Sequence, residues 1–360
     1  MCHIWDGETR ALMAQGDPYG AVKMVTVIVT SSFSKAVHPS TAILSELILS
    51  LRRLGMPPAT TVLLAHDGPR LPTSEPSSSG EAVEQFPSAY LEYLARIRNL
   101  LPRLRACTGL ELRLVLRLEN GNLAGNMALA VKLVRTPFIL KAEHDHIFIR
   151  PVPLMSILND MLHDSRIKYV RFNRRRNIQI NCDRGDYVSS EHKYAARAVW
   201  ARHTPPPGIG LHCNYTRTPC FSDMNHVVRT QHFREMLLPL MMASPETMPE
   251  TVMQRKIMQN VGDFGTFIFG SPGHASTIVH ADASIHGNGE LVPEVTRWVK
   301  KQVAIKSVPM DEQSVCHSSF PMKWVTKDSI KRARRNKRGG TKRRGAKHRA
   351  HYAAEASATG

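Results

Sequence analysis

The chain has 360 residues, 42% of them hydrophobic, and a formal net charge of +18 at pH 7. This length and composition predict that most of the chain folds, as one large α/β domain or two smaller ones. No apolar run is long enough to span a membrane, and residues 1–20 lack the apolar centre of a secretory signal. We therefore expect a cytoplasmic protein, with a Golgi location open if an N-terminal anchor is missing from the sequence. The six cysteines form no C-x-x-C pair and are expected to be reduced thiols.

The first half of the chain predicts alternating strands and helices. Residues 24–30 are nearly all apolar or β-branched, as in a buried parallel strand. A helix opens at Pro39 and Ser40, carries apolar residues on one face over 43–54, and ends at Gly55. Further strands are expected at 61–65, 112–118 and 138–142, and further helices at 90–104 and 122–134. This order predicts a doubly wound sheet.

The second half is less regular. Short strands are expected at 167–172, 266–269 and 277–280, and a helix at 251–261. Residues 173–220 are rich in Pro and Gly and predict long loops. From Ser329 onward Lys, Arg, Gly and Ala dominate and no apolar period survives, which predicts a disordered tail.

Four polar residues, Glu143-His144-Asp145-His146, follow directly on the apolar strand 138–142. Ligands of open α/β sheets bind outside the carboxyl ends of the strands. Carboxylates at such a place suit Mg²⁺ or Mn²⁺. Because residues two apart on a strand point the same way, Glu143 and Asp145 are predicted to converge on one metal–phosphate site.

Several motifs, taken in order over about residues 24–290, resemble the GT-A glycosyltransferases, most closely family 2-like members. They are Val25–Thr30 followed by Ser31-Ser32-Phe33 and His38-Pro39-Ser40, then His66-Asp67-Gly68-Pro69, then Gly121–Asn126 opening a helix, and Thr136–Leu140 before Glu143-His144-Asp145. The resemblance implies a Rossmann-like GT-A fold, with a mixed, mostly parallel central sheet flanked by helices. It also implies Thr30 and Asp67 at the nucleoside, Asn126 near it, and Glu143 and Asp145 at metal and ribose. Glu143 stands where the commonest motif has Asp.

The resemblance further implies a hexosyltransferase-like activity. The donor would be a UDP- or GDP-sugar, the acceptor a hydroxyl of a glycan, protein or lipid, and the cofactor Mn²⁺ or Mg²⁺. His280, with His286 as the alternative, resembles the third protein ligand of the metal. An inverting reaction needs a base in the acceptor half, for which Asp223 and Glu250 are the candidates. A retaining mechanism would need neither.

The sequence therefore divides into four expected parts. They are an N-terminal extension (1–22), a nucleotide-sugar-binding half (23–150), an acceptor-binding half of the same catalytic domain (151–326) and a disordered basic tail (327–360). Residues 327–349 hold twelve Lys or Arg and one acid, so this stretch carries +11 of the net charge. The segment Lys331–Arg349 is therefore predicted to contact an anionic membrane or nucleic acid.

Two other functions stay open from the sequence alone. A metal-dependent nucleotidyltransferase or phosphohydrolase could use the same acids and histidines. A non-enzymatic nucleic-acid-binding protein could act through its basic tail, and its binding would be strongly salt-dependent.

Overall fold

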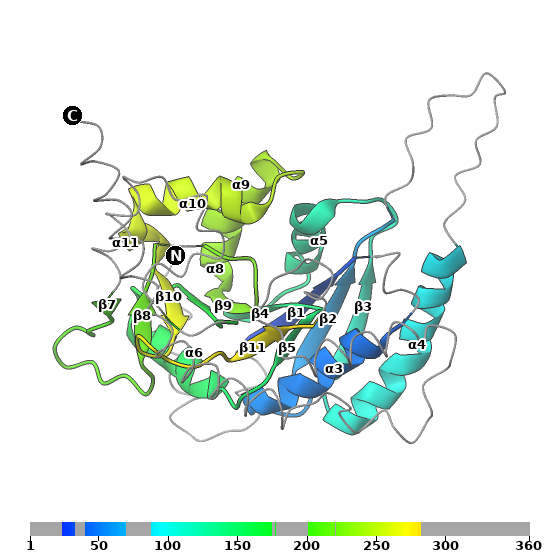
Figure 1. The fold of residues 1–360 in the computed structure, drawn as a ribbon, viewed down its shortest axis with the longest axis horizontal. Coiled ribbons are helices and arrows are strands. Elements are labelled where there is room, and N and C mark those ends of the chain that lie inside the picture. Colours follow the sequence, from blue (N-terminus) through cyan, green and yellow to red (C-terminus); the bar gives the residue numbers. More distant parts are fainter. Residues whose placement is uncertain are drawn as a thin grey trace, which may run out of the picture.

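The computed structural model describes residues 24–32, 40–69, 88–174, 177, 201–219 and 221–281. The expected N-terminal extension, the basic tail and His286 lie outside these residues. The described chain forms one large twisted sheet with helices against both faces, and a small two-stranded sheet beside it (Figure 1).

The large sheet has nine strands in the order β3-β2-β1-β4-β9-β6-β10-β8-β7. Their bounds are β1 (Val25–Ser31), β2 (Thr61–His66), β3 (Glu111–Leu116), β4 (Phe138–Glu143), β6 (Tyr169–Arg171), β7 (Ala201–Arg202), β8 (Tyr215–Arg217), β9 (His226–Arg229) and β10 (Thr266–Phe269). The small sheet pairs β5 (His146–Phe148) with β11 (Ile278–His280). The helices are α3 (Ala42–Ser50), α4 (Ser88–Thr108), α5 (Asn122–Val131), α6 (Leu154–His163), α8 (Thr230–His232), α9 (Leu238–Ala243), α10 (Pro249–Gln259) and α11 (Val261–Phe264), with a 3₁₀ turn η1 (Leu51–Leu54) and a π-helical turn η3 (Phe233–Leu237).

The sheet is mixed and mostly parallel. Strands β3, β2, β1 and β4 pair in parallel, whereas β9 and β8 each run antiparallel to both neighbours. Since β6 and β10 also pair in parallel, seven of the nine strands share one direction. The predicted α/β architecture, a mixed and mostly parallel sheet flanked by helices, is confirmed.

Two apolar clusters hold the three layers together. One joins the sheet to α3, α4 and α6 and includes Val27, Leu47 and Ile97. The other joins the opposite face to α5, α9 and α10 and includes Ile28 and Met127. Figure 1 shows α3 and α4 on one side of the sheet and α5 and α9 on the other. The alternation of Val27 and Ile28 between the clusters follows from the period of two along a strand.

Most elements of the first half lie within two residues of their predicted bounds. Helix α3 with η1 ends at Gly55, whose φ of +62° is the left-handed conformation that glycine adopts most readily. The second half shows elements that the sequence did not predict, namely α6, β9, α8, η3, α9 and α11. The structure also places two short strands, β7 and β8, in the segment predicted to be loop.

Two further observations bear on the predictions for cysteines and membrane spans. Cys107 of α4 is disulfide-bonded, so the expectation of reduced thiols is wrong at this position, whereas Cys213 is a free thiol. The spacing of the cysteines in the sequence did not predict this disulfide, because the fold, not sequence proximity, brings two half-cystines together.

Among the described residues, none of the helices combines the length and apolar character needed to cross a bilayer.

A buried carboxylate on α6 anchors the segment that leads into β8. Asp160 is 0% exposed. Its oxygens accept hydrogen bonds from the backbone N–H of His212 (2.8 Å) and Cys213 (2.9 Å) and from the Tyr215 hydroxyl (2.7 Å). These contacts stabilise the irregular stretch before β8, where no apolar pattern specifies the conformation.

Replacing Asp160 should destabilise the protein more than removing one of its partners. Asp160→Ala leaves several buried donors unpaired and should lower the free energy of unfolding by about 3 kcal/mol or more. Tyr215→Phe removes one hydrogen bond and should cost about 1 kcal/mol. Urea denaturation of both variants measures the difference, and equal losses would contradict the anchoring role.

Candidate active site

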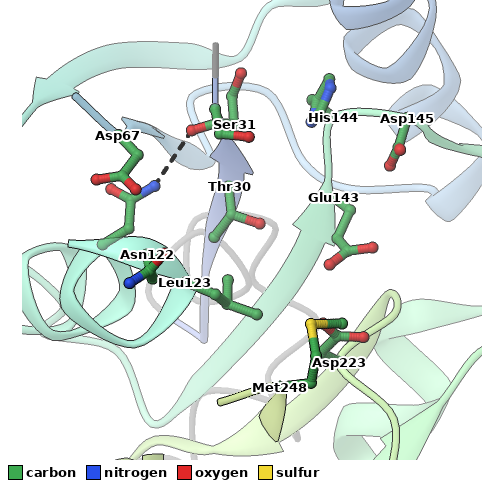
Figure 2. Close-up of a pocket in the computed structure, with 12 residues that line it drawn as sticks. Thr30, Ser31, Asp67, Asn122, Leu123, Glu143, His144, Asp145, Asp223 and Met248 are labelled. Carbon is green, nitrogen blue, oxygen red and sulfur yellow. Dashed lines mark hydrogen bonds between the residues drawn. The ribbon is translucent and has the colours of Figure 1, made fainter. Parts of the chain in front are cut away.

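The carboxyl ends of β1, β2 and β4 lie side by side and form one wall of a cleft. The parallel register places Thr30 opposite Ala65 on one side and opposite Glu143 on the other. The cleft has a volume of about 210 Å³. Its lining residues are Thr30, Ser31, Ser32, Asp67, Asn122, Leu123, Asn126, Glu143, His144, Asp145, Asp223 and Met248. Figure 2 shows Asp67 and Asn122 on one side, Glu143 and Asp145 on the other, and Asp223 and Met248 facing them.

Asp67 fixes the loop before α5 against the end of β2. Its Oδ1 accepts hydrogen bonds from the N–H groups of Gly121 (2.8 Å) and Gly68 (3.1 Å), and its Oδ2 accepts one from Asn120 Nδ2 (3.2 Å). Burial raises the pKa of this carboxyl, although the backbone hydrogen bonds and the nearby Arg117 act in the opposite direction. Asp67 thus lines the cleft and at the same time shapes its wall.

Asn126 joins α5 to the ends of β1 and β2. Its Nδ2 donates to the carbonyl oxygens of Ala65 (2.8 Å) and Ser31 (3.4 Å, dashed in Figure 2). Its Oδ1 is buried and has no hydrogen-bond partner among the described residues. An unsatisfied buried acceptor carries a cost that a ligand donor would remove.

Glu143 is held from two sides. Its Oε1 accepts a hydrogen bond from Lys141 Nζ (2.8 Å), and its Oε2 lies 2.7 Å from His146 Nδ1. Burial alone would raise the pKa of this carboxyl, but Lys141 and His146 hold it at about 2. Glu143 is therefore ionised at neutral pH.

Asp145, His146 and His280 form a compact group at the other end of the cleft. The antiparallel pairing of β5 with β11 sets His146 opposite His280, and their rings stack at a centroid distance of 4.5 Å. Asp145 Oδ2 lies 2.8 Å from His280 Nε2, and its Oδ1 lies 3.3 Å from His146 Nδ1. Burial alone would raise the pKa of the Asp145 carboxyl, but His144 and His280 hold it well below its usual range.

This group fits a divalent metal ion. One ligand atom from each of the three residues lies within 4.8 Å of the others. A carboxylate with two imidazoles suits Mn²⁺ better than Mg²⁺, which prefers an all-oxygen shell. The ionised state of Asp145 meets the requirement that a metal ligand be deprotonated.

Glu143 and Asp145 both line the cleft, but strand alternation, the expected reason, does not bring them together. Strand β4 ends at Glu143, and residues 144–145 form a turn, so strand alternation does not orient Asp145. Both carboxylates instead approach the same atom, His146 Nδ1. The sequence motif contained His146, but only the β5–β11 pairing shows that it is a candidate ligand.

The two predicted bases lie next to each other. Glu250 Oε1 accepts a hydrogen bond from the backbone N–H of Asp223 (3.1 Å). Burial and the neighbouring carboxylates of Glu143 and Glu250 raise the pKa of Asp223 well above its usual range. Asp223 lines the cleft, whereas Glu250 does not. Of the two, Asp223 is therefore the one that faces the cleft.

Comparisons with known proteins give remote structural matches. No protein-family model matches the sequence, and no curated protein matches it. S. aureus TarS is 14% identical, with a TM-score of 0.39 over 81% of this chain, and this chain spans 41% of the TarS chain. The mannosyltransferase PcManGT from Pyrobaculum calidifontis, solved with GDP-Man and Mn²⁺, is 12% identical, with a TM-score of 0.37 over 91% of this chain and 92% of that one.

A third match is the 4-diphosphocytidyl-2C-methyl-D-erythritol synthase from Anaerococcus prevotii. It is 7% identical, with a TM-score of 0.40 over 78% of this chain and 97% of that one. Independently of these matches, the strand order gives the mixed, mostly parallel sheet that the sequence resemblance implied. Sequence identities of 7% to 14% do not indicate which reaction the cleft of this chain supports.

Gly68 should be essential to the cleft because another stretch of backbone passes directly over it. A Cβ at this position would lie 2.4 Å from the carbonyl oxygen of Leu118 and 2.6 Å from the carbonyl carbon of Glu119. Gly68→Ala should displace Asp67 and lower the free energy of unfolding by about 2 kcal/mol.

Gly210→Ala is the matched control, because a Cβ at Gly210 would meet nothing within 4 Å. It should change stability by less than about 0.5 kcal/mol. Thermal unfolding of both variants measures the contrast, and similar melting temperatures would contradict the close approach at Gly68.

Proposed function

We propose that the chain is a metal-assisted glycosyltransferase that moves a hexose from a UDP- or GDP-sugar to an acceptor hydroxyl. The observation that supports this most is the convergence of five separately predicted residues on one cleft. They are Thr30, Asp67, Asn126, Glu143 and Asp145. Ligands of open α/β sheets bind at such strand ends.

The cleft divides into two chemically distinct sides. Thr30, Asp67 and Asn126 supply hydrogen-bonding groups for a nucleoside. On the other side, Asp145, His146 and His280 would hold Mn²⁺, with Glu143 beside them. When bound, Mn²⁺ neutralises the charge that develops on a leaving diphosphate.

The transfer itself requires one bond to form and one to break. The acceptor oxygen attacks the anomeric carbon, and the bond from that carbon to the diphosphate oxygen breaks with its electron pair going to the diphosphate. The hydroxyl proton passes to the Asp223 carboxylate, which lines the cleft. We propose an inverting outcome, in which the acceptor attacks on the face opposite the leaving group. Glu250 positions Asp223, because its carboxylate accepts a hydrogen bond from the backbone N–H of Asp223.

The products distinguish this function from the nucleotidyl transfer that the same acids could support. Glycosyl transfer releases a nucleoside diphosphate, whereas nucleotidyl transfer from a nucleoside triphosphate releases pyrophosphate. Deleting residues 327–360 distinguishes the proposed function from nucleic-acid binding through the tail. If the tail binds RNA or DNA, the deletion should remove that salt-sensitive binding. If the chain is a glycosyltransferase, the deletion should leave sugar-nucleotide hydrolysis intact.

Calorimetric titration with UDP and GDP tests the donor site. Wild type should bind one of them at least about tenfold more tightly with Mn²⁺ than without it, and Asp145→Ala should remove this difference. The matched control Glu92→Ala changes an exposed acid of α4 paired with Arg96, and should behave as wild type. If neither nucleotide binds wild type in either condition, the proposed function is wrong.

The pH dependence of turnover tests the base. The raised pKa of Asp223 means that this carboxyl holds its proton at low pH and becomes a base only as the pH rises through that pKa. The kcat for sugar-nucleotide hydrolysis should therefore rise with pH. Asp223→Asn should lower kcat about 100-fold or more and abolish this rise. An unchanged profile in Asp223→Asn would assign the base elsewhere.

A further inference from the structure

Lys141 is a positive charge in the middle of an apolar strand. It lies in β4, between β1 and β9, and is 1% exposed. Its neighbours across the two pairings are Ile28 and His226. A buried ammonium destabilises the fold unless it is paired and hydrogen-bonded, so the partners of Lys141 indicate its role.

The partners of Lys141 belong to the two sides of the cleft. Its Nζ donates to Glu143 Oε1 at 2.8 Å and also to the backbone carbonyl oxygen of Asp223. Lys141 and Glu143 are two residues apart on one strand, so their side chains leave the sheet on the same face. Asp223 is 82 residues further along the chain, in the loop before β9. One ammonium group therefore joins the donor strand to the loop that carries the candidate base.

Stability alone is a weak reason for this arrangement. Replacing a buried ion pair by well-packed apolar side chains is often neutral or stabilising. Ile139, two residues before Lys141 and on the same face of β4, is 0% exposed and belongs to an apolar cluster. Packing on that side of Lys141 therefore does not call for a charge.

We propose that Lys141 is a positioning residue of the active site, which fixes the Glu143 carboxylate and the Asp223 segment relative to each other. The role rests on the proposed function, since it aligns the donor sugar with the group that takes the acceptor proton. Lys141 holds Glu143 and the Asp223 carbonyl, whereas Asp145 is held by His146 and His280. Loss of Lys141 should thus impair turnover more than nucleotide binding.

The test compares Lys141→Met with wild type by two measurements. The first is the Kd for UDP and GDP with Mn²⁺, and the second is kcat for hydrolysis of the sugar nucleotide that wild type cleaves. We expect kcat to fall about tenfold or more and the Kd to change less than about threefold. Lys168→Met is the matched control, because Lys168 also donates to a backbone carbonyl, that of Asp263, and neither residue lines the cleft. Its kcat should stay within about twofold of wild type.

A double-mutant cycle shows whether Lys141 acts through Glu143. If it does, the kcat of the double variant Lys141→Met/Glu143→Gln should lie within about twofold of the kcat of the slower single variant. Additive losses would overturn the coupling. Where Lys141→Met does not fold, Lys141→Arg keeps the charge but changes the geometry, and should lower kcat while preserving the Kd.

The outcomes separate this role from the proposed function. Wild type that binds neither nucleotide overturns the function and the role together. If wild type binds a nucleotide but the Lys141 variants keep the wild-type kcat, the role of Lys141 is overturned and the function stands. The same holds if the variants lose kcat and affinity by the same factor.

Discussion

The parallel pairing of β1 with β2 and β4 is the constraint on which the site depends. It brings the ends of three strands to one edge, so Thr30, Asp67 and Glu143 become neighbours although they are far apart in sequence. The carbonyl-rich end of such a sheet, with polar residues just beyond it, is where an open α/β fold can receive a ligand. Helices pack on both faces of the sheet, and the cleft lies at this end of the strands.

Interactions between charged side chains also shape the site that the strand register brings together. The carboxylates of Glu143, Asp145 and Asp223 lie around one small cleft, where like charges would repel if left alone. Lys141 and His146 lower the pKa of Glu143, and His144 and His280 lower that of Asp145, whereas burial and the neighbouring carboxylates raise the pKa of Asp223. Groups with pKa values driven apart in one cleft are typical of a site where ions bind and protons move.

The sequence predicted the first half of the fold well, because its strands and helices carry long apolar periods. It predicted the second half poorly. Strand β9 has only four residues and gives no long pattern, whereas α6 carries a readable helical period in Leu154, Ile157, Leu158 and Met161. Five predicted donor-site residues line one cleft, but their roles stay predictions. His146 and Lys141 were missed as functional residues. Lys141 had a readable signal, a single charge in an apolar strand two residues before an acid, whereas the role of His146 depends on a strand pairing over more than 130 positions.

The small β5–β11 sheet has a consequence for how the protein matures. His280 meets Asp145 across 135 positions of the chain, and β10, the last strand of the large sheet among the described residues, ends at Phe269. During synthesis all the described strands of the large sheet are therefore complete before His280 is added. A chain that ended before β11 would lack one of the three groups that could hold the cation.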